Sequence, residues 1–237
     1  MRIAFYDFDG TLVASNIVAR YASLIQRLPS RTMAMWKNVR LISGVPTYLL
    51  LDRLSRRLFN QIFFREYCGV SQAWLEQRSE ELFEQVIRPG IYPGALELVQ
   101  QDRQQGFRVV LVTGEIGSIL APVVRYFGFE GLVCNSLIFE NGIATGEVVQ
   151  PLIAEEGKVK AMEKECRNHH AELAQAKAYS DSFSDVPMLE AVGNPSAVNP
   201  DARLRKVAKA RGWRIVELGR QGRSKAAVER GNHVHVP

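Results

Sequence analysis

Near its N-terminus the chain reads Arg2-Ile3-Ala4-Phe5-Tyr6-Asp7-Phe8-Asp9-Gly10-Thr11-Leu12. The apolar run is typical of a buried strand in a parallel sheet, and two aspartates one residue apart follow it. Because side chains at i and i+2 of an extended chain point to the same side, Asp7 and Asp9 would share one site. That site lies at the carboxyl end of the strand, where open α/β sheets bind ligands. Gly10 permits the sharp turn that follows.

This aspartate pair indicates a metal site with phosphoryl chemistry. Two close carboxylates repel each other, and a hard divalent cation such as Mg²⁺ relieves the repulsion. Asp7 would be ionised at neutral pH and could attack phosphorus to give an aspartyl-phosphate. Asp9 suits a second task, which is to protonate the leaving oxygen and then to take a proton from the hydrolytic water.

The composition is that of an ordinary globular protein, with 237 residues and a net charge of +5. So mild a surplus gives no reason to expect a nucleic-acid partner. The cysteines Cys68, Cys134 and Cys166 are widely spaced and predict reduced thiols in a cytoplasmic protein. We see no signal peptide before the first strand and no apolar run of membrane-spanning length. The oligomeric state is not indicated.

From residue 88 to residue 218, segments of strand and helix character alternate. Strands are predicted at 107–112, 132–134, 176–180, 197–199 and 213–218, and helices at 93–106, 116–127, 158–169, 186–192 and 200–211. Asn141-Gly142 predicts a hairpin over 137–149. This order predicts an α/β fold, a Rossmann-like parallel sheet with helices on both faces, built from residues 1–15 and 88–218. Residues 219–237 lose the periodicity, so we expect a flexible tail.

Residues 16–87 show no strand pattern and predict an inserted helical cap. One helix is expected over 16–28, a basic and apolar stretch over 41–64 is interrupted by Gly44 and Pro46, and Ser71 would cap a helix that runs to about residue 87. Between positions 20 and 65 there are nine cations and a single acid, Asp52, for a net charge of +8. Three interpretations stay open: a cap that attracts an anionic substrate, a contact with an anionic membrane surface, or a solvated helical face.

Further polar residues follow the later strands and complement the aspartates. Thr113 and the Gly114 amide could hold a phosphate oxygen, and Lys158 could neutralise the nucleophile and the phosphoryl group, although Lys160 or Lys164 could replace it. Asp181 could complete a Mg²⁺ site, and Asp185 could bind the metal or orient Lys158. Phosphoryl transfer depends mainly on charge neutralisation and in-line positioning, which such a set supplies.

The chain resembles the haloacid dehalogenase-like hydrolase superfamily, and within it the branch that is similar to phosphoserine phosphatase. The resemblance is carried by Asp7-Phe8-Asp9-Gly10-Thr11, Leu111-Val112-Thr113-Gly114, Lys158 and Ser180-Asp181-Ser182-Phe183-Ser184-Asp185. It implies that Asp7 is the nucleophile, that Asp9 is the acid/base and a main-chain carbonyl ligand, and that Asp181 is the third protein ligand of Mg²⁺. It also implies Gly10, Thr113, Gly114 and Lys158 as phosphate-binding residues and a helical cap over the site.

Departures from the family pattern bear on the substrate. Phosphoserine phosphatases carry a glutamate for the substrate ammonium shortly after the first motif, and the matching position here is Asn16. We therefore expect a phosphatase for a small anionic phosphomonoester other than phosphoserine. The runner-up is a lipid phosphate such as phosphatidylglycerophosphate at a membrane surface, and a phosphotransferase fits the same motifs. A binding protein with a silent site is disfavoured, because Asp7, Asp9, Lys158 and Asp181 are all intact.

Overall fold

The computed structural model describes residues 1–219, except for the side chain at position 52. Most of the predicted tail, from residue 220 on, lies outside the described residues. In the described part of the chain no helix is both long enough and apolar enough to cross a membrane.

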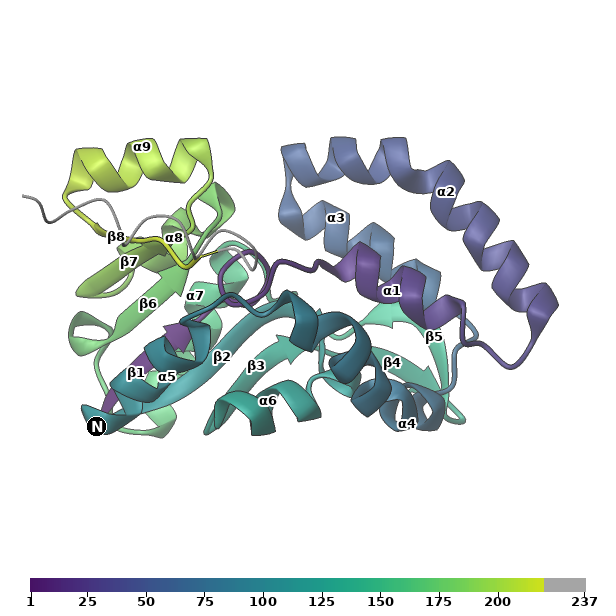
Figure 1. The fold of residues 1–237 in the computed structure, drawn as a ribbon, viewed down its shortest axis with the longest axis horizontal. Helices are drawn as coiled ribbons and strands as arrows, with labels where there is room; N and C mark the ends of the chain where they lie inside the picture. The colour runs from purple at the N-terminus through teal and green to yellow at the C-terminus, as the bar shows by residue number, and fades with distance from the viewer. Residues whose placement is uncertain (220–237) are drawn as a thin grey trace, which may run out of the picture.

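A six-stranded parallel sheet forms the centre of the core and confirms the predicted α/β fold (Figure 1). Its strand order is β3-β2-β1-β6-β7-β8. The strands are β1 (Arg2–Tyr6), β2 (Phe107–Ile116), β3 (Gly131–Asn135), β6 (Lys177–Ser180), β7 (Asn194–Val198) and β8 (Arg214–Val216). Because β1 lies between β2 and β6, the residues that follow these three strands meet at one edge.

Helices cover both faces of the sheet, as the alternating pattern predicts. Ala4 and Tyr6 of β1 pack on one side with α5 (Ala95–Gln104) and α6 (Ala121–Phe127). Ile3 and Phe5 point to the other side, towards α7 (Glu156–Asn168), α8 (Val186–Glu190) and α9 (Ala202–Arg211). A strand whose two sets of alternate side chains are both buried must be apolar throughout, which is why the first strand stands out in the sequence.

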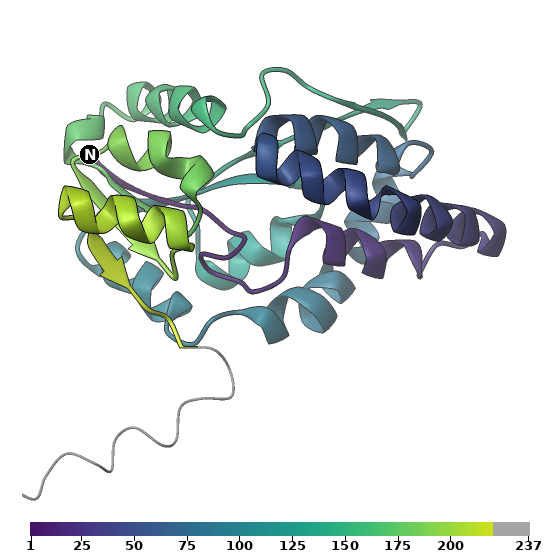
Figure 2. The same ribbon diagram turned by 90° about the horizontal axis from the view of Figure 1, so that it is seen from above.

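The cap is built on four helices beside the carboxyl edge of the sheet (Figures 1 and 2). They are α1 (Ile17–Ile25), α2 (Arg31–Leu54), α3 (Arg56–Phe63) and α4 (Gln72–Leu82). The Ser71 hydroxyl caps α4 by accepting a hydrogen bond from the Trp74 amide, as predicted. The hairpin of β4 (Leu137–Glu140) and β5 (Ile143–Val148) also packs here, because the Gly69 amide donates to the Ala144 carbonyl and the Ala144 amide donates to the Val70 carbonyl. We propose that the cap comprises residues 16–87 with this hairpin attached.

Two predictions about local structure are wrong. The interruption at Gly44 and Pro46 does not occur, because α2 runs unbroken through both. The Tyr48 ring lies over Gly44, where a Cβ atom would come within 2.6 Å of it, so this glycine serves packing within a helix. The helix predicted from Ile116 starts only at Ala121, because β2 continues to Ile116, which pairs with Asn135 of β3.

Candidate active site

The predicted site residues converge on one small cavity at the carboxyl edge of the sheet. The cavity has a volume of about 30 Å³. Seven predicted residues line it: Asp7, Asp9, Thr113, Gly114, Lys158, Asp181 and Asp185. They come from the ends of β1, β2 and β6 and from the start of α7, which the strand order brings together.

Lys158 links two carboxylates at the base of this cavity. Its Nζ atom donates to Asp7 Oδ1 at 2.6 Å and to Asp185 Oδ2 at 2.8 Å, and all three side chains are buried. Burial alone would lower the pKa of Lys158, but the charges of Asp185 and Asp7 raise it above its usual value, so the ammonium stays charged. Asp185 also accepts a hydrogen bond from the Ser180 hydroxyl at 2.7 Å. The alternatives Lys160 and Lys164 are exposed, so the position is that of Lys158.

Asp7 and Asp181 form the carboxylate pair of the site. The Thr11 hydroxyl lies 3.0 Å from Asp7 Oδ2 and 3.1 Å from Asp181 Oδ1. Burial raises the pKa of Asp7 to about 6, against the opposing effect of Lys158. Burial and the charges of Asp7 and Asp185 also raise the pKa of Asp181 well above its usual range. Two close carboxylates, one buried and one half-buried, would be relieved of their mutual repulsion by a divalent cation.

The oxygen donors of Asp7 and Asp181 are of the kind that Mg²⁺ prefers, so these two carboxylates would fit the ion. The described residues contain no group of three or more His, Cys, Asp and Glu side chains arranged for a metal ion. Gly10 leaves the space for Asp181, because a Cβ atom at position 10 would lie 2.0 Å from Asp181 Oδ2.

The side chain of Asp9 is engaged with the cap rather than with Asp181. Arg20, which is fully buried in α1, contacts Asp9 Oδ1 through Nη1 and Asp9 Oδ2 through Nη2, each at 2.7 Å. The Nε atom of Arg20 donates to Glu115 Oε2 at 2.7 Å, just beyond Thr113 and Gly114 on β2. Burial raises the pKa of Glu115, although the neighbouring guanidinium opposes the shift.

Thr113 and Gly114 lie near the carboxyl end of β2, beside the cavity. The Thr113 hydroxyl oxygen accepts the Glu115 amide at 3.1 Å, which leaves its proton available to a ligand in the cavity. The Gly114 carbonyl accepts the Asn135 side-chain amide at 2.8 Å. A Cβ atom at position 114 would come within 2.8 Å of Asn60 in the cap, so the glycine allows the cap to approach closely.

Three cap residues, Ile17, Arg56 and Asn60, also line the cavity, as do Ile153, Ala154, Ser182 and Ser184 of the core. The core holds this part of the cap through Glu155, whose Oε1 atom accepts hydrogen bonds from the Ser55 hydroxyl at 3.0 Å and from the Arg56 amide at 2.8 Å. Glu155 therefore caps the N-terminus of α3 from outside, and it does so in a left-handed conformation with φ of 50°. This contact holds the first turn of α3, and with it Arg56, beside the predicted site residues.

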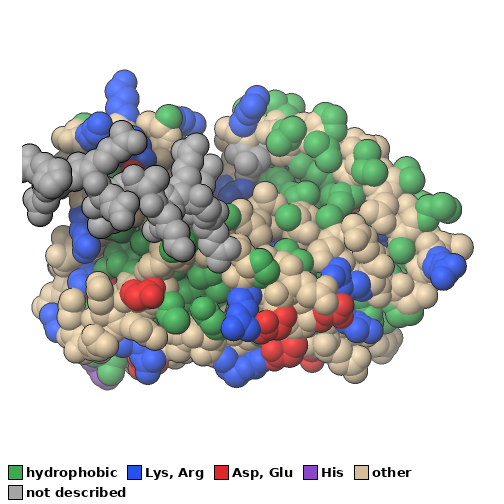
Figure 3. Space-filling view, in the orientation of Figure 1, with side chains coloured by type: hydrophobic (Ala, Val, Ile, Leu, Met, Phe, Trp, Pro, Cys, Tyr) green, Lys and Arg blue, Asp and Glu red, His purple; other side chains and the backbone are tan. Residues whose placement is uncertain are grey.

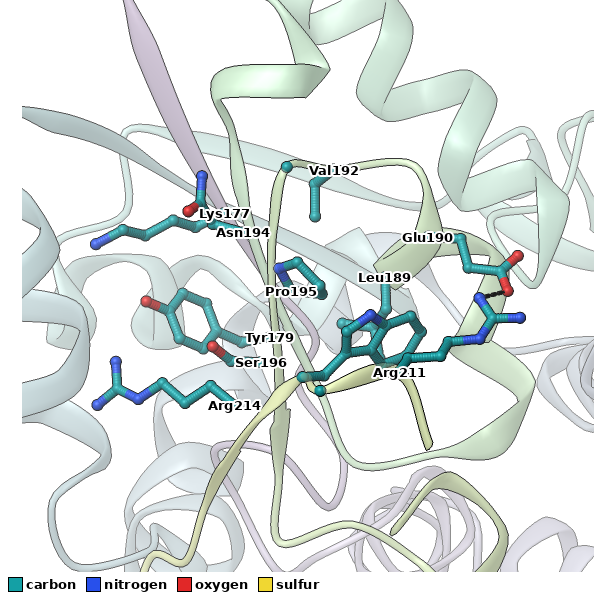
Figure 4. Close-up of a pocket in the computed structure, with 13 residues that line it drawn as sticks. Lys177, Tyr179, Leu189, Glu190, Val192, Asn194, Pro195, Ser196, Arg211 and Arg214 are labelled. Atoms are coloured by element: carbon teal, nitrogen blue, oxygen red, sulfur yellow. Dashed lines mark ion pairs between the residues drawn. The ribbon is translucent and has the colours of Figure 1, made fainter. Parts of the chain in front are cut away.

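Two larger hollows lie outside this cavity. A groove of about 780 Å³ between cap and core adjoins the cavity and shares Arg56, Ser182 and Ser184 with it. A hollow of about 790 Å³ lies at the amino ends of β6, β7 and β8, the opposite edge of the sheet (Figure 4). Among its charged groups, Arg211 pairs with Glu190 and Lys177 pairs with Asp102. We assign no catalytic role to it.

The sequence interpretation missed Arg20, Glu115, Asn60 and Glu155. Arg20 left a signal, because it lies three residues after Ile17 and four before Leu24, on the apolar side of α1. A cation on an apolar helix face must find a buried partner. The other three gave no signal, since their roles depend on how the cap meets the core.

Comparison with known proteins identifies the family. Residues 4–190 match the haloacid dehalogenase-like hydrolase family. A Mycobacterium tuberculosis protein (strain ATCC 25618 / H37Rv) named phosphoserine phosphatase SerB1 is 37% identical over 220 residues, covering 90% of this chain and 69% of that protein. The crystal structure of a Bordetella pertussis Tohama I protein of unknown function matches with a TM-score of 0.78 and 28% identity, covering 92% of this chain and 99% of that one. The structure of a phospho-aspartyl intermediate analogue of phosphoserine phosphatase has the same fold, with a TM-score of 0.68 at 18% identity and coverage of 92% and 94%. The chain therefore belongs to the haloacid dehalogenase-like hydrolases.

Proposed function

We propose that this hydrolase is a Mg²⁺-dependent phosphomonoesterase that acts through an aspartyl-phosphate on Asp7. The observation that supports this most is the contact of 2.6 Å between Lys158 Nζ and Asp7 Oδ1 inside a cavity that Asp181 also lines. A buried lysine beside a buried aspartate holds a carboxylate ready to attack and neutralises the charge that phosphate brings.

The proposed reaction gives each of these side chains a role. A carboxylate oxygen of Asp7 attacks phosphorus, the bond from phosphorus to the ester oxygen breaks, and Asp9 gives that oxygen a proton. Water then attacks phosphorus and loses a proton to Asp9, which releases phosphate and restores Asp7. Lys158 and the Thr113 hydroxyl hold the phosphoryl oxygens throughout. Bound Mg²⁺ would supply charge neutralisation at the same oxygens.

The cap supports a small anionic substrate. Arg56 is the charged cap residue that lines the cavity, and Asn60 offers an amide beside it. In the described part of the cap no carboxylate lines the cavity. Asn16, at the position where an ammonium-binding glutamate would stand, is exposed and caps α1 by accepting the Ala19 amide at 3.0 Å. These features favour an anionic leaving group over phosphoserine, and the unpaired cysteines support a cytoplasmic location.

A lipid phosphate is the second candidate, and one observation favours it. The groove beside the cavity is lined in part by the apolar side chains of Leu54, Phe183 and Val186, together with Arg53 and Arg203 and with the acids Glu155, Glu156 and Asp201. An amphiphilic leaving group would suit such walls.

Phosphate release from a panel of phosphomonoesters tests the proposal. The panel includes p-nitrophenyl phosphate, phosphoserine and phosphatidylglycerophosphate, each with Mg²⁺ or EDTA, for the wild type and Asp7→Asn. We expect Mg²⁺-dependent turnover that Asp7→Asn abolishes. Arg56→Gln should raise KM for small anionic esters and leave p-nitrophenyl phosphate less affected, with Arg57→Gln, an exposed neighbour, as the control. Product analysis with added alcohols separates hydrolysis from phosphotransfer, and no turnover of any ester would contradict the proposal.

A further inference from the structure

Helix α2 carries a concentration of exposed apolar side chains on the cap. Of the thirteen large apolar side chains that are exposed among the described residues, eight belong to this helix, with exposed fractions between 39% and 70%. They gather over the cap in the space-filling view (Figure 3). Apolar patches of this extent on a globular protein mark interaction surfaces.

Four of these apolar side chains lie in one stripe with an arginine at each end, and we call this stripe the outer face of α2. It follows the helical spacing through Arg31, Met35, Val39, Ile42, Leu49 and Arg53. All six side chains are exposed. The helix is about 36 Å long at 1.5 Å per residue, and the stripe extends along most of it.

The opposite side of α2 fixes this orientation. Lys37, Leu41 and Tyr48 are buried, and Lys37 Nζ donates to the carbonyl oxygens of Glu66 at 2.6 Å and Cys68 at 2.9 Å. A rotation of the helix that hid the outer face would leave this ammonium without its acceptors. The exposure of the stripe is therefore built into the cap.

Part of the basic surplus of the cap is used in ion pairs within the protein, and two of the other cations, Arg31 and Arg53, lie on the outer face. Arg20, Arg27 and Arg40 pair with Asp9, Glu81 and Glu66. By contrast, Arg31, Arg53 and Arg57 are exposed and have no ion-pair partner in the described part of the chain. Arg31 begins the outer face and Arg53 ends it, so an apolar surface lies between two uncompensated positive ends.

We propose that the outer face of α2 docks on an anionic lipid bilayer and lies in its interfacial layer. The apolar stripe would enter the headgroup boundary while the arginines at its ends meet lipid phosphates. A second copy of the chain fits less well. Pairing two such faces in either direction brings arginines together, and the described side chains of the face include no acid to compensate them. The docking can be tested independently of the proposed activity, because vesicle binding is measured without substrate turnover.

Co-sedimentation of the full chain with vesicles tests the docking. The probes are phosphatidylcholine vesicles with and without about one-third phosphatidylglycerol, at low and at physiological salt. We expect binding to the anionic vesicles, weakened by salt. Ile42→Ser/Leu49→Ser should weaken binding about tenfold or more, and Arg31→Gln roughly fivefold.

Matched controls distinguish vesicle binding through the outer face of α2 from binding through any exposed apolar side chain. Leu132→Ser/Val149→Ser removes two exposed apolar side chains elsewhere and should leave binding unchanged. Circular dichroism checks that each variant is folded, and Arg31→Gln provides a second test if the double variant on α2 is not. No binding to anionic vesicles at low salt overturns the proposal, as does equal binding by both α2 variants and wild type. A dimer that Ile42→Ser/Leu49→Ser disperses, without vesicle binding, would assign the face to a second copy.

Discussion

The guanidinium of Arg20 holds both carboxylate oxygens of Asp9 at 2.7 Å, across the boundary between cap and core. The proposed reaction needs Asp9 to give a proton to the leaving oxygen and to take one from water, and both of its carboxylate oxygens contact Arg20 in this structure. Because Arg20 belongs to α1, a movement of the cap would directly change the contacts of the Asp9 carboxylate.

Arg20→Gln should lower the free energy of unfolding by about 3–5 kcal/mol, because it leaves the carboxylates of Asp9 and Glu115 without their buried partner. Urea denaturation measures the loss. Arg27→Gln, which breaks the more exposed pair with Glu81, is the control and should leave the unfolding midpoint almost unchanged. Equal midpoints for the two variants would show that the buried pair does not hold the cap to the core.

Asp185→Asn should reduce kcat roughly tenfold to a hundredfold and leave KM nearly constant. Asp185 does not face the leaving group but holds Lys158 Nζ at 2.8 Å, so its loss loosens the lysine rather than substrate binding. Steady-state kinetics with p-nitrophenyl phosphate measure both parameters. Lys158→Met should be more severe, and wild-type turnover by Asp185→Asn would remove the positioning role.

Binding of Mg²⁺ should release protons below about pH 6. Burial raises the pKa of Asp7 to about 6 in the metal-free protein, so at pH 5.5 a cation must displace a proton to bind there. The apparent affinity should fall by up to about tenfold per pH unit for each proton displaced. Calorimetry in buffers of different ionisation enthalpy counts the protons. Asp7→Asn should release fewer, and proton-free binding by the wild type at pH 5.5 would contradict the prediction.

Asn16→Ala should cost about 1 kcal/mol of stability and leave kcat/KM unchanged, because the side chain caps α1 and does not line the cavity. Asn16→Asp keeps the cap and serves as the control. Urea denaturation and steady-state kinetics test the two halves of this expectation. A selective change in phosphoserine turnover would instead place position 16 in substrate recognition.

The parallel sheet could be predicted well from the sequence because the patterns that indicate it are local. Strand β1 is apolar on both sides, and Asp7 and Asp181 follow strands whose ends must meet at one edge. The turn residues Ser71 and Asp201 also marked their helices, since each accepts an amide from the first turn. These features depend on neighbours within a few residues or on the general rules of parallel sheets.

The relation between cap and core was harder to predict because it depends on distant partners. Arg20 and Glu115 are 95 residues apart, and Glu155 meets Ser55 across 100 residues. Counting charges treated Arg20 as part of a basic surface, whereas it is a buried residue with two carboxylate partners. The predicted interruption at Gly44 and Pro46 was wrong for a related reason, since tertiary packing of α2 outweighs their local preference against a helix.

The approach of Gly10 to Asp181 limits how this site can vary over evolutionary time. Residue 10 already has the smallest side chain, and residue 181 has the shortest acidic one. If Gly10 were replaced by alanine, its Cβ atom would lie 2.0 Å from Asp181 Oδ2, and no shorter carboxylate exists to relieve the overlap. A genetic screen for second-site revertants of Gly10→Ala should therefore find no compensating change at position 181. Lineages that keep Asp181 would have to keep the glycine as well.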